Sequence, residues 1–173
     1  VALVPVESPD EAELVFINTC AFIQPATEES VRTIAQAIAD IEELPKRPLL
    51  AVAGCLVGRY HAEDLAPELP EVDLWLDNSD LEAWPAMLAR KLGLPEPTVP
   101  GRILSTGPSY AWLKISDGCR HACSFCAIPN IRGGHRSHCK DMIVREARAL
   151  LDQGVKELNL VAQDLTEWGC DLD

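Results

Sequence analysis

The chain has 173 residues, of which 47 % are hydrophobic and 24 % are charged, a composition typical of folded globular proteins and unlike disordered or collagen-like chains. No apolar run approaches the roughly 20 residues that span a bilayer, and no basic-then-apolar leader opens the sequence, so we expect neither a membrane span nor a secretory signal. The net charge of −12 disfavours a dedicated DNA-binding module, because an acidic surface repels phosphate. The chain opens on Val1 rather than Met, so we expect further residues upstream.

Strands and helices alternate through the first half of the chain. Apolar, β-branched runs predict strands at residues 14–18, 49–53 and 72–76. Helical periodicity predicts a helix that Thr27 caps and Pro45 ends, and further helices at 59–69 and 81–91. This alternation favours an α/β fold with a doubly wound parallel sheet over residues 1–92.

Two cysteines follow the first two predicted strands. Cys20 comes after the first strand and Cys55 after the second. Ligands of parallel sheets bind beyond the carboxyl ends of the strands. We therefore expect both thiols at the ligand-binding edge of one sheet.

A composition break separates this part from the rest. Residues 93–109 contain four prolines and three glycines, which predicts a linker. A second domain then begins, with a strand at 110–115, a helix that Asp141 caps and Gly154 ends, and a strand at 158–162. This strand–helix–strand pattern is typical of a barrel unit, and we expect the chain to stop inside this second domain, at residues 110–173.

Three of the seven cysteines stand within eight residues, as Cys119-x-x-x-Cys123-x-x-Cys126. An odd number of cysteines argues against a disulfide scaffold. Three chemistries remain open: a zinc site completed by a histidine, a redox pair at Cys123 and Cys126, and an iron–sulfur cluster with one iron that lacks a protein ligand. Cys139 and Cys170 fall outside both cysteine sets, and we predict no role for them.

The three-cysteine loop, with Phe125 before its last cysteine, resembles the signature of radical S-adenosylmethionine (SAM) enzymes. The resemblance to one family, the methylthiotransferases, covers nearly the whole chain except the linker. It rests on Ile115–Pro129 with Arg132-Gly133, on Asn18-Thr19-Cys20-Ala21-Phe22-Ile23 and on Ala53-Gly54-Cys55-Leu56. Gln163-Asp164 and Trp168-Gly169 are most similar to the branch that modifies an aspartate of a small-subunit ribosomal protein.

The resemblance implies a radical SAM domain, a partial TIM-type barrel, and two 4Fe-4S clusters. Cys119, Cys123 and Cys126 would hold a cluster whose open iron binds SAM. Cys20, Cys55 and a third cysteine that this sequence lacks would hold a sulfur-delivering cluster. Phe125 and Gln163 are the expected contacts to SAM. The implied product is a methylthio group on the aspartate β-carbon.

The resemblance also implies partners: the ribosomal protein, an external reductant and a sulfur donor. We expect a cytoplasmic protein without membrane contact, and RNA contact only through a C-terminal domain that this sequence lacks. We do not expect this segment alone to be active. Two alternatives stay open, a tRNA adenosine methylthiotransferase of the same family and a non-catalytic zinc-binding interaction module.

Overall fold

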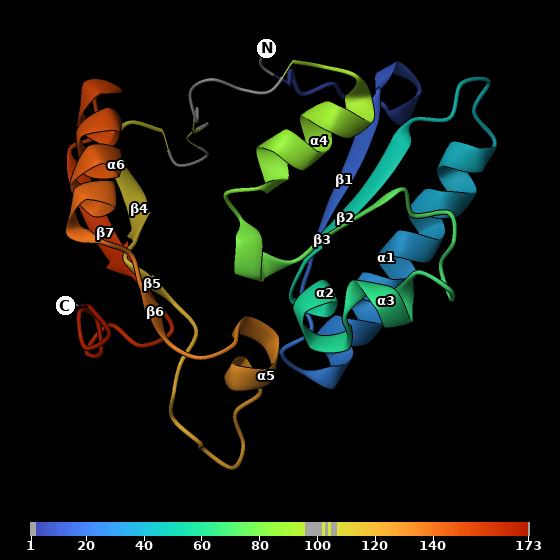
Figure 1. Ribbon diagram of the computed structural model, residues 1–173. Coiled ribbons are helices and arrows are strands. Elements are labelled where there is room, and N and C mark those ends of the chain that lie inside the picture. Colours follow the sequence, from blue (N-terminus) through green and yellow to red (C-terminus); the bar gives the residue numbers. More distant parts are fainter. Residues whose placement is uncertain (1–2, 96–101, 103, 105–106, 173) are drawn as a thin grey trace. The chain divides into compact units, whose positions relative to one another are not determined.

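The computed structural model describes residues 3–95, 102, 104 and 107–172 (Figure 1). The chain divides into two compact units, Val1–Val99 and Pro100–Asp173, and each is described by itself below. The linker predicted at 93–109 lies partly outside the described residues, so its limits and those of the two domains stay predictions.

A three-stranded parallel sheet forms the centre of the N-terminal unit. Its order is β1 (Leu14–Thr19), β2 (Leu49–Gly54), β3 (Leu74–Leu76). Helix α1 (Gln24–Glu42) connects β1 to β2, and α2 (Cys55–Tyr60) and α3 (Ala62–Leu65) connect β2 to β3. A short 3-10 turn, Pro9–Glu11, precedes β1, and another, Asn78–Asp80, leads from β3 towards α4 (Trp84–Leu92).

Both faces of this sheet are covered. Leu50 and Val52 of β2 point to one side and join a core that includes Ile34 and Ile41 of α1. The alternate residues of β2 point to the other side, where Ala51 and Ala53 meet Leu76 and the partly buried side chains Trp84, Met87 and Leu88. Central strands buried on both faces read as continuous apolar runs. The predicted α/β fold with a doubly wound parallel sheet is confirmed.

Three predicted helix boundaries in this unit are wrong. Thr27 is not a cap, because α1 begins at Gln24 with a proline in its first turn, a position that proline's fixed φ suits. The helix predicted at 59–69 is two short helices, because His61 adopts a φ of 59° that ends α2. Helix α4 begins at Trp84 rather than at residue 81.

The C-terminal unit contains the predicted strand–helix–strand pattern. Strand β4 (Tyr110–Lys114) pairs in parallel with β7 (Glu157–Val161). Helix α6 (Lys140–Asp152) lies between them in sequence and begins after Cys139, so the predicted cap at Asp141 is wrong. Its buried Leu150 packs with Ala111 and Leu113 of β4. The described residues of this unit form one such pattern and no closed barrel.

Two small features of this unit were not predicted. Strands β5 (Ser116–Asp117) and β6 (Arg136–Ser137) pair antiparallel, and α5 (Ile128–Arg132) lies between them in sequence. The signal for α5 was present, since Pro129 stands in its first turn and Gly133 follows its end.

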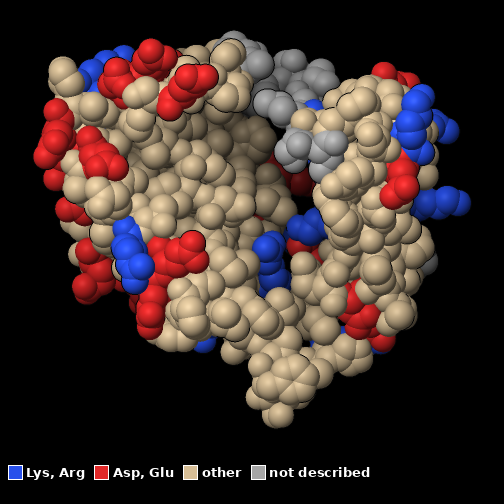
Figure 2. Space-filling view, turned by 180° about the vertical axis from the view of Figure 1, so that it is seen from behind, with Lys and Arg blue, Asp and Glu red and all other residues tan. Residues whose placement is uncertain are grey.

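Charge is distributed unevenly over the surface. On the face shown in Figure 2, Asp and Glu predominate over the N-terminal unit, whereas α6 of the C-terminal unit carries three Lys or Arg and three Asp or Glu residues. Among the described residues, no helix is both long enough and apolar enough to cross a membrane.

Candidate metal centres

Cys20 and Cys55 stand at the carboxyl ends of neighbouring strands. Thr19 and Gly54 are paired as the last residues of β1 and β2, so the two cysteines are the next residues along each strand. Cys20 is exposed and Cys55 is half-buried. The structure thus brings the two predicted thiols to one sheet edge, and their function as ligands stays a prediction.

Hydrogen bonds hold the backbone around both cysteines. The buried Thr19 hydroxyl donates to the carbonyl of Ala53 (2.6 Å) and accepts from the amide of Leu56 (3.2 Å), on either side of Cys55. The Ser30 hydroxyl of α1 accepts from the amide of Cys20 (3.0 Å) and donates to its carbonyl (2.7 Å). The backbone at Cys20 and at the start of α2, where Cys55 stands, is therefore held by the side chains of Thr19 and Ser30.

An arginine of α2 connects this helix to the segment after Cys20. Arg59 Nη1 donates to the carbonyl of Ala21 at 2.6 Å, and its guanidinium lies over the ring of Tyr60, 5.5 Å from the centroid. A hydrogen bond from a charged donor is stronger than one between neutral groups. The chain after Cys20 is thus anchored to the helix that begins at Cys55.

The second cysteine group lies in the loop that follows β5. Cys119 and Cys126 are half-buried and Cys123 is exposed. The amide of Cys126 donates to the carbonyl of Cys123 (3.0 Å), and the amide of Cys119 donates to the carbonyl of Gly133 (3.2 Å). Gly118 has a φ of 70°, and a Cβ there would overlap the carbonyl of Gly134, so glycine is required at the start of this loop.

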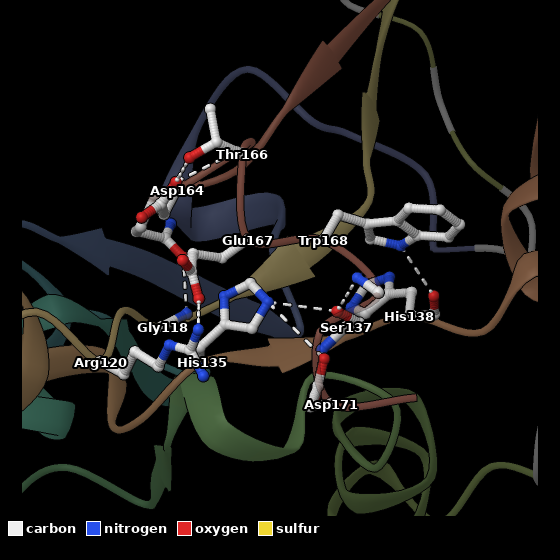
Figure 3. A network of polar contacts seen from close by, with 12 residues as sticks. Gly118, Arg120, His135, Ser137, His138, Asp164, Thr166, Glu167, Trp168 and Asp171 are labelled. Carbon is white, nitrogen blue, oxygen red and sulfur yellow. Dashed lines mark hydrogen bonds and ion pairs between the residues drawn. The ribbon is translucent and has the colours of Figure 1, made fainter. Parts of the chain in front are cut away.

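Three contacts connect this loop to the turn after β7, and Figure 3 labels Arg120 and Glu167, the two partners of one of them. The amide of Gly118 donates to Gln163 Oε1 at 2.7 Å. Arg120 forms an ion pair with Glu167. His121 Nε2 lies 2.9 Å from Asp164 Oδ2. The predicted site residue Gln163 therefore meets the cysteine loop, while its predicted contact with SAM stays a prediction.

Asp164 is oriented by its own turn. Its Oδ1 accepts from the amide of Thr166 (3.0 Å) and from its hydroxyl (2.8 Å), which leaves Oδ2 directed at His121. The Thr166 hydroxyl chiefly, with the Thr166 amide and His121, lowers the pKa of Asp164 below its usual value, because hydrogen bonds to a carboxylate favour its charged form.

Among the described residues, Cys119, His121 and Asp164 form a group of side chains that could bind one metal ion. One ligand atom from each lies within 4.8 Å of the other two. The sequence interpretation missed this group because Asp164 is 45 residues beyond Cys119 and only the pairing of β4 with β7 brings them together. Phe125, by contrast, is 90 % exposed and belongs to no core, so its predicted contact with SAM also stays a prediction.

A second polar network joins β6 to the segment that follows β7 (Figure 3). Ser137 donates its amide to Asp171 Oδ2 (2.9 Å), and its hydroxyl accepts from the amide of Gly169 (2.8 Å). The Trp168 indole donates to the carbonyl of His138 (3.1 Å). His135 Nε2 lies 3.1 Å from the Ser137 hydroxyl. This network fixes the segment and gathers no further ligand set.

Comparison with known proteins places the chain. Residues 2–77 match the family model described as "Uncharacterized protein family UPF0004". Three similar relatives are each named "Ribosomal protein uS12 methylthiotransferase RimO": from Nitratidesulfovibrio vulgaris (67 % identity over 99 % of this chain and 40 % of the relative), from Oleidesulfovibrio alaskensis (61 %, 97 % and 39 %) and from Lawsonia intracellularis (55 %, 96 % and 38 %). The chain thus spans about 40 % of the length of these curated relatives. On this similarity, which extends over nearly its whole length, the chain belongs to the family of RimO-like methylthiotransferases.

Proposed function

We propose that the protein carrying this chain is a radical SAM methylthiotransferase that adds a methylthio group to the β-carbon of an aspartate in ribosomal protein uS12. Relatives with 55–67 % identity carry the uS12 name. The observation that carries the proposal is the three-cysteine loop beside the turn after β7, joined through Gly118 and Gln163. Because the chain spans about 40 % of those relatives, the proposal concerns the whole protein, and this segment alone is not expected to be active.

The C-terminal cysteine loop fits an iron–sulfur cluster by its donors. Three thiols stand on one loop with half-buried or exposed side chains, and thiolates are the ligands of such clusters. Each cysteine of a cluster binds a different iron, so their sulfurs are held farther apart than ligands of one ion. The absence of Cys123 and Cys126 from the compact group around Cys119 is therefore compatible with a cluster. Cys119, Cys123 and Cys126 would hold it and leave one iron for SAM.

The N-terminal pair fits two ligands of a second cluster. Cys20 and Cys55 each follow the last residue of a strand, and these two residues, Thr19 and Gly54, are paired at one sheet edge. Ser30, Thr19 and Arg59 hold the backbone beside them. We propose that a third cysteine, which this sequence does not contain, completes this sulfur-delivering cluster.

When bound, the clusters supply one-electron cleavage of SAM and sulfur for transfer. The residues of this chain would bind and orient. The exposed ring of Phe125 offers a face for adenine, and stacking of this kind contributes roughly 1 kcal/mol. Gln163 accepts from Gly118 through its oxygen, which leaves its NH₂ group to donate to a SAM carboxylate. The Arg120–Glu167 ion pair keeps the cysteine loop beside the turn.

The chemistry requires partners outside the chain. We propose an external one-electron reductant, a sulfur donor that restores the second cluster, and the ribosomal protein as substrate, all in the cytoplasm and without membrane contact. RNA contact would come through a C-terminal domain that lies outside this sequence.

Anaerobic reconstitution of the full-length protein with iron and sulfide tests the proposal. We expect about four irons per cluster and an electron paramagnetic resonance signal of the reduced protein that shifts when SAM is added. Mass spectrometry of uS12 after incubation with SAM and reductant should then show one methylthio group in place of one aspartate hydrogen. A signal that ignores SAM, or modification of tRNA adenosine instead of uS12, would refute the proposed function.

A further inference from the structure

The group formed by Cys119, His121 and Asp164 differs from the set proposed to bind the cluster. Only Cys119 belongs to both sets. A thiolate, an imidazole and a carboxylate are the three ligand types that zinc takes in proteins, and three protein ligands leave a fourth position for water. Cys123 and Cys126 do not enter this group.

The distances suit one small ion. Two nitrogen or oxygen ligands of a tetrahedral zinc, each at about 2.0–2.1 Å, lie roughly 3.3 Å from each other. His121 Nε2 and Asp164 Oδ2 are already 2.9 Å apart. The sulfur of Cys119 lies within 4.8 Å of one imidazole nitrogen of His121 and of one carboxylate oxygen of Asp164, so a movement of side chains by about 1–2 Å would bring the sulfur to the roughly 2.3 Å of a zinc–sulfur bond.

The groups around these three residues hold them in place. Thr166 fixes the Asp164 carboxylate through two hydrogen bonds to Oδ1, the arrangement in which outer-shell partners orient metal ligands. The Gly118–Gln163 hydrogen bond holds the two ligand-bearing segments together immediately beside the group. The carbonyl of Gly133 accepts from the amide of Cys119, so the backbone of the thiol ligand is also anchored.

The ion pair of His121 with Asp164, whose side chain is 13 % exposed, contributes little to the stability of the metal-free fold. The His121 side chain is 55 % exposed, and ion pairs at such sites contribute at most about 1 kcal/mol and often nothing measurable. Three donors of different chemistry nevertheless meet from two segments of the chain. The two ligands nearest in sequence from these segments, His121 and Asp164, are 43 residues apart.

We propose that the cluster-free protein binds one divalent transition-metal ion of the Zn²⁺ type through Cys119, His121 and Asp164. This ion and the iron–sulfur cluster exclude each other, because both require the Cys119 thiolate. Zinc bound in this way would keep the cysteine loop beside the turn after β7 and would delay assembly of the cluster until it dissociates.

Cobalt binding tests the site, because Co²⁺ replaces Zn²⁺ and is visible by absorption. The full-length protein is prepared iron-free with C123S and C126S, which removes two of the predicted cluster ligands and leaves the proposed ion site intact. Titration with Co²⁺ should give tetrahedral d–d bands and a thiolate-to-cobalt charge-transfer band. In the same background, His121→Ala or Asp164→Asn should lower the Co²⁺ affinity, measured from these bands, by about tenfold or more.

The matched control is Asp152→Asn, which removes an exposed carboxylate at the end of α6. This variant should bind Co²⁺ with the affinity of the C123S and C126S protein. Adding C119S should abolish the charge-transfer band of this site. Unchanged Co²⁺ affinity in both His121→Ala and Asp164→Asn, or a charge-transfer band whose intensity C119S does not lower, would overturn the proposal, since any band left after C119S belongs to the N-terminal thiols Cys20 and Cys55. Circular dichroism of each variant shows whether the fold is kept, and if one variant unfolds the other decides.

Competition gives a second readout. Zn²⁺ added before iron and sulfide should slow iron uptake by the three-cysteine loop in the protein with all its cysteines, and His121→Ala should remove that delay. Equal delay with and without His121 would contradict mutual exclusion at this site. Neither readout depends on methylthiotransferase activity, so a failure here and a failure of the proposed function are distinguishable.

Discussion

At the scale of single residues, Gly54 is the position where the N-terminal site depends most on the backbone. It has a φ of 104° and a ψ of −158°, a region essentially restricted to glycine. A Cβ there would also overlap the Thr19 carbonyl. We therefore expect Gly54→Ala to lower the free energy of unfolding by roughly 3 kcal/mol, measured by urea denaturation, and to displace Cys55.

Gly93 is the matched control for this substitution. Its φ is 67°, but nothing lies within 4 Å of the Cβ that alanine would add. Gly93→Ala should cost only about 1 kcal/mol, the price of a left-handed backbone for a residue with a Cβ. If the two substitutions cost the same, close contact between β1 and the start of α2 does not constrain this edge.

Thr19 connects the two loops through one hydroxyl. Thr19→Val keeps the shape but leaves the amide of Leu56 without its buried acceptor, which costs about 1–3 kcal/mol. Thr19→Ser should recover most of that loss because it retains the oxygen. Urea unfolding of the three proteins checks the order, and a valine variant as stable as the parent would show that the hydroxyl is dispensable.

At the scale of elements, the cysteine loop depends on the turn after β7. Gln163→Ala removes the acceptor for the Gly118 amide, so exchange of that amide with solvent deuterium should become about tenfold faster. Gln153→Ala is the control, because the exposed side chain of Gln153 donates to the carbonyl of Ala149 in α6 rather than to the cysteine loop. Unchanged exchange at Gly118 in Gln163→Ala would mean that other contacts hold the loop.

The segment after β7 gives a pH-dependent contribution to stability. The Ser137 hydroxyl, followed by the Ser137 amide, lowers the pKa of Asp171 below its usual value of 3.8. A folded-state pKa below the unfolded one stabilises the fold at pH values above 3.8, and this contribution is lost as pH falls through the lowered pKa.

Asp171→Asn should therefore make the unfolding temperature fall less steeply as the pH drops below 4. Near neutral pH, where the parent carboxylate is charged in both states, the substitution should not change how the unfolding temperature depends on pH. Asp152→Asn serves as the control and should keep the slope of the parent. A parent slope that survives Asp171→Asn would show that other groups determine the acid sensitivity of this unit.

Local patterns predicted the elements well and their junctions poorly. Sequence patterns predicted β1, β2 and α6 because buried residues follow a recognisable pattern along the chain. This pattern is a continuous apolar run in the two strands and a helical spacing of apolar residues in α6. The break at His61 has no such signal, since a positive φ at a residue other than glycine is set by its surroundings. The meeting of Cys119 with Asp164 depends on strand pairing between distant segments, and neither residue predicts it alone.

At the scale of the whole molecule, the two cysteine sets belong to separate compact units. Each set is held by hydrogen bonds from its own unit: Thr19, Ser30 and Arg59 in the first, Gln163 and Gly133 in the second. The two clusters should consequently assemble independently. We expect the C119A, C123A and C126A triple variant of the full-length protein to lose about four irons, and the C20A and C55A double variant to lose the remainder.

Iron analysis after anaerobic reconstitution measures both losses, and electron paramagnetic resonance identifies which signal responds to SAM. The response should vanish in the triple variant and persist in the double variant, because only the C-terminal set is proposed to leave an iron open. If the double variant also loses the response to SAM, the sites are coupled and independent assembly of the two units is wrong. If the triple variant keeps all its iron, the three-cysteine loop holds no cluster, and among the described residues of this unit Cys119, His121 and Asp164 remain as the candidate metal ligands.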